Sequence, residues 1–345
     1  MASRSAPSHS VAMPRPELRA TAAALAAAFG DTTFTAQDAG NVGVPHQRLA
    51  SATRAGLVHR LRRGHFRIAR AGIEDSRLAD CLERLSQRGI HACVGRRTAA
   101  DIWDVPVWLP QTQSTPTVLV PRSAPVGMGL RGGVFLKGCD IDPRRIVMGP
   151  TSQPVTDPLL TAAHVASTRG ATFAQAMVVL CGAMRCQLGW VSPEGASVTR
   201  LASRGEIREH LVAELRDAVT HADVRTHPRA LAAVPYADPR LETALESLSW
   251  ARFIEGGIDL PEPQVWVTGA SGRAWRVDFL FGGRVIGECD GAVKYVEGDS
   301  LWKEKKRQSD LEESGYIVVR WTWEEIAFRP HVVLARIARA LSRAV

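Results

Sequence analysis

The stretch WRVDFLFGGRVIGECDGAVKY, residues 275–295, decides the fold of the last third of the chain. Two apolar runs in it are separated by a glycine pair, which is a turn signal between extended segments. The stretch therefore predicts two antiparallel strands, with Asp278 on the first and Glu288 and Asp290 on the second. Because side chains alternate between the two faces of a strand, Glu288 and Asp290 point to one face and the residue between them points to the other. The hairpin brings Asp278 alongside them.

The sequence on either side of this hairpin completes a domain. A helix is predicted before it and a charged helix, a strand and a closing helix after it. The order α-β-β-β-α-β-α predicts a mixed sheet flanked by helices. The expected elements are a helix over 239–253, strands over 264–269, 273–281 and 284–290, a helix over 301–314, a strand over 316–322 and a helix from about 331.

The three carboxylates of the hairpin indicate a metal-dependent chemistry. Converging carboxylates repel one another unless a cation neutralises them, and oxygen ligands alone suit Mg²⁺ or Mn²⁺ better than Zn²⁺. Hydrolysis of a phosphodiester needs such a cation to polarise a phosphoryl oxygen and to lower the pKa of a bound water. The alternative is a pair of surface strands with ordinary acidic residues. The apolar runs VDFLF and VIGECD favour burial of at least one face.

Residues 241–325, including RVDFLF, GECDGAVKY and LWKEKKRQSDLEESGYIVVRWTW, resemble the Vsr-like endonuclease domains, a branch of the PD-(D/E)XK superfamily. The resemblance implies a Mg²⁺- or Mn²⁺-dependent endonuclease that cleaves DNA. It makes Asp278 the central metal ligand and Glu288 the second acidic residue, and Asp290 with Gly291 forms the Asp-Gly step of this branch. Glu246, on the preceding helix, would be the acid that closes the site as a further metal ligand.

This chain departs from the wider superfamily at one position. The general signature has lysine two residues after the second acid, where this chain has Asp290. Lys294 and Lys305 are the candidates for the missing lysine. The other basic residues of that helix, Arg307 among them, are expected on a solvated face. A degenerate domain that binds DNA without cutting it stays open as the alternative.

The segment PHQRLASATRAGLVHRLRRGHFRIAR, residues 45–70, contains seven arginines and three histidines but no acidic residue. Thr35 is expected to cap a first helix, Pro45 begins a second one, and a hairpin follows around Gly64. This layout predicts a winged helix-turn-helix. The expected DNA contacts are His46, Gln47, Arg48, Ser51 and Arg54 in the major groove and Arg60, Arg62, Arg63 and Arg67 on phosphates. The alternative is a basic surface that contacts another protein.

Residues 34–69 also resemble the N-terminal winged-helix domain of AbiEi-like antitoxins of type IV toxin-antitoxin systems. RRTAADIWDVPV, TVLVPR and QPVTDPLLTAAHVA look like the second domain of that family. Because such antitoxins bind their own promoter DNA, the resemblance implies DNA binding, without implying a toxin partner. A regulator of this kind, with no enzymatic activity, is the alternative function.

Together these patterns predict that the 345-residue chain is an α+β or α/β multidomain protein. The expected segments are a disordered tail (1–15), the winged helix-turn-helix (16–72), an AbiEi-like middle domain (73–195), a helical connector (196–235) and the Vsr-like nuclease domain (236–345).

The bulk composition fits a protein that binds nucleic acid. A formal charge of +8 and a pI near 9.6 favour anionic partners, although an arginine-rich composition set by the genome would give the same balance. Six scattered cysteines lack the spacing of a zinc site, and no apolar run is long enough to span a bilayer. We therefore expect a cytoplasmic protein. His164 and four aromatic residues, Trp302, Tyr316, Trp321 and Trp323, are expected to pack in the core or at its edge.

The pattern Gly127-x-Gly129-x-x-Gly132 matches a dinucleotide-binding fingerprint by its letters only. That fingerprint requires a strand before it and a helix after it. Here a Pro-containing stretch precedes the glycines and a strand candidate, GVFLKG, follows them. We expect a flexible loop.

Overall fold

The computed structural model is a mixed α+β protein that divides into two compact units, Met1–Ala79 and Asp80–Val345. It describes residues 21, 24–25, 27–29, 34–54, 58–62, 65–68, 76–108, 115–150, 153–192, 196–223, 228–290 and 298–344. The predicted tail and the positions Gly56, Arg63, Gly64 and Lys294 lie outside these residues. Within the described part, no helix combines the length and the apolar character needed to cross a membrane.

In the part of the first unit that the structure describes, helical residues between 21 and 29 precede two short helices and a three-stranded antiparallel sheet. Thr35 begins the first helix with a capping box, because its side chain accepts the Asp38 N–H while the Asp38 carboxylate accepts the Thr35 N–H. The predicted cap, the second helix after Pro45 and the hairpin are confirmed. The elements are β1 (Phe34–Thr35), α2 (Ala36–Asn41), α3 (His46–Arg54), β2 (Val58–Arg62) and β3 (His65–Ile68), with strand order β1-β3-β2.

The boundary between the two units falls within helix α4 (Ser76–Gln87), and the second unit contains a six-stranded mixed sheet of strand order β6-β7-β5-β4-β9-β8. Strand β4 pairs in parallel with β9, and β5 pairs in parallel with β7. The elements are α4 (Ser76–Gln87), β4 (Cys93–Val94), α5 (Arg96–Trp103), β5 (Thr117–Val120), β6 (Gly129–Arg131), β7 (Val134–Gly138), η1 (Pro143–Arg145), β8 (Ile146–Met148), β9 (Pro154–Thr156) and α6 (Pro158–Ala166).

The glycine-rich segment before β7 is a hairpin. The loop expected there is wrong in part, because Gly129 begins strand β6, which pairs with β7. The turn residues Gly132 and Gly133 both have positive φ, which a glycine adopts without steric cost. A strand follows the glycines, so the fingerprint is not of the dinucleotide-binding type.

A group of helices links the six-stranded sheet to the C-terminal region. The longest of them, α7, has a threonine-glutamine capping box at its start and buries residues on all sides. A helix that is apolar all round belongs in a core, and α7 packs against α6, α10 (Pro228–Ala233) and α11 (Ala244–Glu255). The helices are α7 (Phe173–Val191), α8 (Val198–Ala202), α9 (Gly205–Thr220), α10 (Pro228–Ala233) and η2 (Val234–Tyr236).

His164 lies on α6 with 1% of its surface exposed, which confirms that it is a core residue. Its Nε2 donates a hydrogen bond to the carbonyl of Ala222 at 2.9 Å. Burial, with the nearby Arg96 charge as a second cause, lowers the pKa of His164 to about 4 from 6.5. The folded protein therefore holds this histidine neutral over a pH range in which the unfolded chain protonates it.

This difference gives a testable pH dependence. As the pH falls from 6.5 toward 4, His164 becomes protonated in the unfolded chain but stays neutral in the folded protein. This difference lowers the free energy of unfolding by up to about 3 kcal/mol. His164→Gln keeps a hydrogen-bond donor but does not titrate. Urea unfolding at pH 7 and pH ~4.5 should show a smaller loss of stability in the variant than in the wild type. Equal losses would contradict the prediction.

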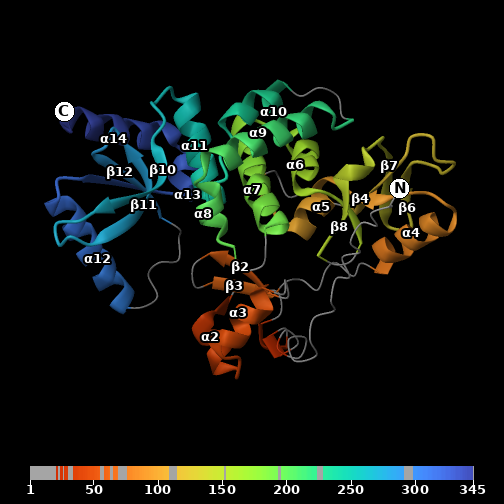
Figure 1. Ribbon diagram of the computed structural model, residues 1–345, viewed down its shortest axis with the longest axis horizontal. Coiled ribbons are helices and arrows are strands. Elements are labelled where there is room, and N and C mark those ends of the chain that lie inside the picture. The colour runs from red at the N-terminus through yellow and green to blue at the C-terminus, as the bar shows by residue number, and fades with distance from the viewer. Residues whose placement is uncertain are drawn as a thin grey trace, which may run out of the picture. The chain divides into compact units, whose positions relative to one another are not determined.

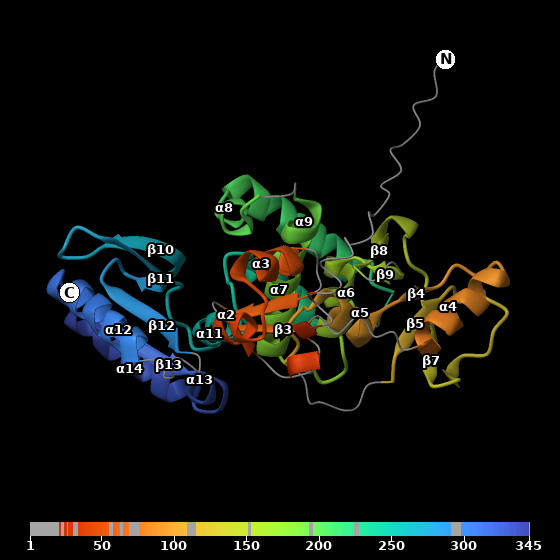
Figure 2. The ribbon, with the colours of Figure 1, turned by 90° about the horizontal axis from the view of Figure 1, so that it is seen from below.

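The C-terminal region contains the predicted α-β-β-β-α-β order, with a four-stranded mixed sheet of order β10-β11-β12-β13. Strands β10 to β12 are antiparallel neighbours, and β12 and β13 pair in parallel. Helix α12 packs against β13, and both are labelled in Figure 2. The elements are α11 (Ala244–Glu255), β10 (Glu262–Thr268), β11 (Ala274–Phe281), β12 (Val285–Asp290), α12 (Gly298–Glu313), β13 (Ile317–Thr322), α13 (Trp323–Phe328) and α14 (Pro330–Arg343).

Helices cover both faces of this sheet (Figure 1). On one face, Phe253 of α11 packs edge-on against Phe279 and Trp321, with ring centroids 5.3 and 5.8 Å away. On the other, Leu311 of α12 packs with Val277 and its neighbours. The acidic strands β11 and β12 thus lie between two hydrophobic layers.

Three sequence expectations for this region are wrong. The helix predicted from Pro239 begins at Ala244, because Thr243 provides the cap. A capping box on Thr322 starts the unpredicted short helix α13. Trp302, expected in the core or at its edge, is 67% exposed, whereas Trp321 is 1% exposed.

Candidate functional site

The hairpin of β11 and β12 brings Asp278 beside Glu288. Phe279 pairs with Gly287 across these strands, and this pair lies next to Asp278 and Glu288 along the two strands. The Asp278 Oδ2 atom also accepts the backbone N–H of Cys289 at 2.8 Å. Asp278 therefore contacts β12 at the residue next to Glu288, and its charge acts on Glu288.

Glu288 is buried, with 3% of its surface exposed, and points toward α12. Its Oε1 accepts a hydrogen bond from the guanidinium of Arg307 at 2.6 Å. Burial, with the negative charge of Asp278 second, raises the pKa of Glu288 to about 7. The surroundings of Glu288 thus disfavour the ionised form of its carboxyl group.

Asp290 lies on the same face of β12 as Glu288. It pairs with Arg320 of β13 at 3.3 Å, and the Arg320 charge also acts on Glu288. The Cys289 sulfur lies near the hydroxyl of Ser249 on α11, at 3.7 Å, on the opposite side of the sheet. The predicted alternation along this strand is confirmed.

Glu246, in the first turn of α11, comes close to the hairpin from the other side. It is 3% exposed, and its carboxylate accepts the Thr243 hydroxyl at 2.9 Å and the Glu242 N–H at 2.8 Å. The Gln264 amide also donates to Glu246 at 2.8 Å and reaches Asp278 Oδ1 at 3.5 Å. Gln264 therefore links two of the three predicted metal ligands.

Gln264 holds this position in a strained backbone conformation. Its φ is +60°, in the left-handed region that non-glycine residues rarely adopt, at a cost of about 1 kcal/mol. The residue interrupts the pairing of β10 with β11 between Pro263 and Val265. Gln264 was not predicted as a site residue, since a glutamine in an expected strand gives no signal of a left-handed turn.

The three carboxylates interact electrostatically through Asp278. Burial raises the pKa of Glu246 too, and Asp278 is again the second cause. The donor set is oxygen only and carries excess negative charge, which fits a hard divalent cation. Among the described residues, however, no three His, Cys, Asp or Glu side chains converge closely enough to hold an ion as they stand. The chemistry of the donors fits Mg²⁺ or Mn²⁺, while Glu246 and Glu288 hold polar partners of their own.

The basic residue that reaches the carboxylates is Arg307. Lys305, the predicted candidate on the same helix, is exposed, and two residues along a helix point to nearly opposite sides. Lys294, the other candidate, lies outside the described residues. The expectation that Arg307 lies on a solvated face is wrong, since its side chain is 13% exposed and paired with Glu288. Its spacing of four residues from buried Leu311 was the available signal.

A second missed residue is Arg276, on β11 next to the acidic hairpin. It donates to Glu242 at 2.7 Å, and Arg185 of α7 donates to the same carboxylate at 2.8 Å. This group joins the start of α11 to the sheet and to α7. It thereby fixes the turn from which Glu246 projects.

The predicted DNA contacts lie on α3 and the hairpin of the first unit. His46, Gln47 and Arg48 are exposed on α3, and Ser51 is half-buried on the same helix. Leu49 and Ala52 of α3 face the core, which leaves the three exposed residues on the outer face. Arg63 and the side chains of Arg54, Arg60, Arg62 and Arg67 lie outside the described residues.

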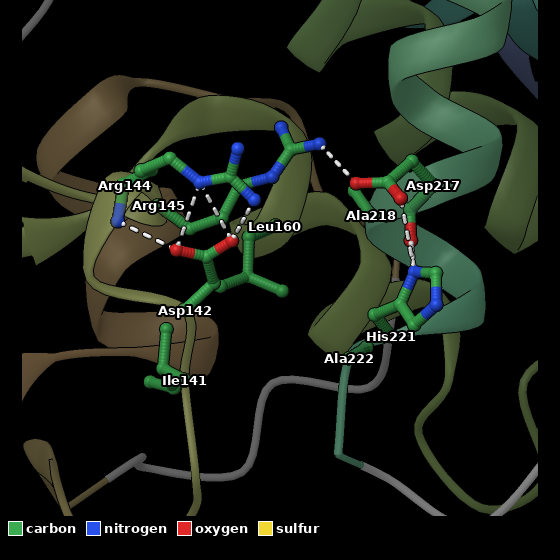
Figure 3. Close-up of a pocket in the computed structure, with 9 residues that line it drawn as sticks. All are labelled: Ile141, Asp142, Arg144, Arg145, Leu160, Asp217, Ala218, His221 and Ala222. Carbon is green, nitrogen blue, oxygen red and sulfur yellow. Dashed lines mark hydrogen bonds and ion pairs between the residues drawn. The ribbon is translucent and has the colours of Figure 1, made fainter.

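A cavity of about 280 Å³ lies elsewhere in the second unit, between η1 and α9 (Figure 3). Its charged groups are matched among themselves. Arg144 pairs with Asp142 at 2.6 Å, while Arg145 and His221 both contact Asp217, at 2.7 and 3.0 Å. Of these pairs, Arg145–Asp217 joins η1 to α9, and we assign the cavity a structural role.

Comparison with known proteins adds a partial likeness. No family model matches the sequence. Uncharacterized proteins of two Mycobacterium tuberculosis strains, CDC 1551 / Oshkosh and H37Rv, are each 34% identical to this chain over 112 residues. The match covers 32% of this chain and 41% of each mycobacterial protein, so the chain spans well under half of the length of these curated relatives.

Proposed function

We propose that this protein binds DNA and cleaves its phosphodiester bonds with a divalent cation held by the C-terminal domain. The observation that carries the proposal is the meeting of Asp278 and Glu288 in a buried acidic site, with Glu246 linked to it by Gln264. The α-β-β-β-α-β order around that site and the sequence resemblance both support a PD-(D/E)XK fold of the Vsr-like branch.

In this proposal Asp278 and Glu288 hold the cation, and Glu246 closes the site from α11. When bound, the cation supplies polarisation of a phosphoryl oxygen and a more acidic bound water. The chain's own residues fix the geometry. The Cys289 N–H holds one oxygen of Asp278, and Gln264 holds Glu246 toward it, so that the carboxylates are oriented before a substrate arrives.

The first unit is proposed to be an AbiEi-like winged helix-turn-helix that docks on duplex DNA through α3. The exposed residues His46, Gln47 and Arg48 support this, because a recognition helix presents its first residues to the major groove. The absence of acidic residues over 45–70 favours a polyanion as the partner.

Arg48→Ala tests this assignment. Losing one arginine contact to a base edge or phosphate should weaken duplex binding by about tenfold and make the salt dependence shallower. Gel shifts at several salt concentrations would measure both. Arg216→Ala, which removes an exposed arginine from α9, serves as the control and should bind like the wild type. Equal affinity of the two variants would contradict the proposed docking.

A second candidate function is a DNA-binding regulator with an inactive nuclease fold. Two observations favour it: Asp290 stands where the superfamily signature has lysine, and Arg307 already pairs with Glu288. This regulator would bind DNA without cutting it.

One experiment separates the two functions. Purified full-length protein is incubated with supercoiled and linear DNA in Mg²⁺ or Mn²⁺, with chelator as the blank, beside Glu288→Gln. Glu313→Gln, an exposed glutamate on α12, is the matched control. The nuclease requires cation-dependent cutting by the wild type and the control but not by Glu288→Gln. If the wild type binds DNA tightly but does not cut it in Mg²⁺ or Mn²⁺, the regulator is the supported function.

A further inference from the structure

Arg307 occupies an unusual place for a residue on a charged helix. It projects from α12 onto the acidic face of the sheet with 13% of its side chain exposed. One of its terminal nitrogens donates both to Glu288 Oε1 at 2.6 Å and to the backbone carbonyl of Arg276 at 3.1 Å. Leu311, one turn further along, is buried in the core and fixes this face of α12 against the sheet.

Arg307 pairs with Glu288, yet burial and the Asp278 charge still raise the pKa of that carboxyl group. Arg307 contributes one positive charge to a group that contains Asp278, Glu288 and Glu246, while Arg320 pairs with Asp290 and Arg276 pairs with Glu242. A buried ion pair also gains little over apolar packing, because both ions lose their hydration. Arg307 therefore lies where a divalent cation would neutralise more of the charge.

We propose that Arg307 and a divalent cation compete for Glu288, and that the displaced guanidinium then binds a phosphate oxygen of the DNA. This inference rests on the proposed nuclease function. It assigns the role of the missing lysine to Arg307, whose planar fork suits two oxygens of one phosphate. The exchange needs only rotation about side-chain bonds, because Leu311 keeps the helix in place.

The competition has a signature that an ordinary catalytic or structural residue lacks. Removing Arg307 takes away both the competing partner of Glu288 and a repelling positive charge. The protein should then bind the cation more tightly and yet cut DNA more slowly. A residue that only supports the fold would weaken both properties.

Calorimetric titration with Mn²⁺ at pH ~8 and a DNA cleavage assay test the exchange on the full chain. Arg307→Gln is expected to bind Mn²⁺ about tenfold more tightly than the wild type, on the scale of one charge-assisted hydrogen bond. Its cleavage rate is expected to fall about a hundredfold, on the scale of one lost stabilising donor. Lys305→Gln removes the same charge from the exposed side of the helix, and both of its values should match the wild type.

Arg307→Lys covers the case in which the glutamine variant does not fold, and its Mn²⁺ affinity should lie above that of the wild type. Mn²⁺ affinity that is unchanged or weaker in the folded Arg307 variants, beside a wild type that cuts DNA, overturns the exchange and leaves the nuclease intact. A wild type that neither binds Mn²⁺ nor cuts DNA overturns the proposed function itself.

Discussion

Asp278→Asn should lower the rate of DNA cleavage by about a thousandfold while making the metal-free protein more stable. Asparagine keeps an oxygen that accepts the Cys289 N–H, so the local fold should persist. After burial, the Asp278 charge is the largest cause that raises the pKa of both Glu246 and Glu288. Removing that charge relieves repulsion between ionised groups, and stability at pH ~8.5 should rise by about 1 kcal/mol.

A fall in cleavage rate together with a rise in stability distinguishes a functional carboxylate from a structural one. Urea unfolding would give the stability and a plasmid-cutting assay the activity. Asp259→Asn, an exposed aspartate of the same domain, is the control and should change neither. A variant with reduced stability and undiminished cutting would assign Asp278 to the fold alone.

Trp321→Ala should destabilise the protein by about 4 kcal/mol, the largest effect on stability that we expect from one substitution. Trp321 is 1% exposed, stacks on Phe279 at 6.1 Å and donates its indole N–H to Ser249 at 2.8 Å. Gly287 leaves room for this indole ring, because a Cβ at that position would lie 2.6 Å from it. Its loss leaves a cavity beneath the strand that carries Glu288.

Trp302→Ala is the matched control, since that indole is 67% exposed and its loss should cost less than about 0.5 kcal/mol. Thermal or urea unfolding of both variants would measure the difference. A cost below about 1 kcal/mol for Trp321→Ala would mean that the aromatic layer does not support the acidic strands as described.

The sequence predicted those parts of the site that depend on local pattern. Alternation and a glycine turn were enough to place Asp278 beside Glu288 and to send Cys289 to the other face. The boundary of α11 was less predictable. Pro239 reads as a first helical residue, but the neighbouring Asp238 and Arg240 form an ion pair at 2.6 Å and the helix cap passes to Thr243.

The contacts between different helices and strands could not be predicted from the local sequence pattern. Nothing near Gln264 in the sequence indicates a left-handed residue, because its conformation depends on Glu246 and Asp278, which belong to other elements. Basic side chains lie on several sides of α12. Only the helical spacing from buried Leu311 indicates that Arg307, and not Lys305, faces the sheet. The order of strands and helices was predictable, whereas the cation that meets the acidic site was not.

Cutting of supercoiled plasmid by the full-length protein in Mn²⁺, compared with Asp278→Asn at equal concentration, tests the central claim most directly. The account predicts nicked and linear products from the wild type, their loss on chelation, and none from the variant. Intact plasmid from both proteins, or equal cutting by both, would contradict it.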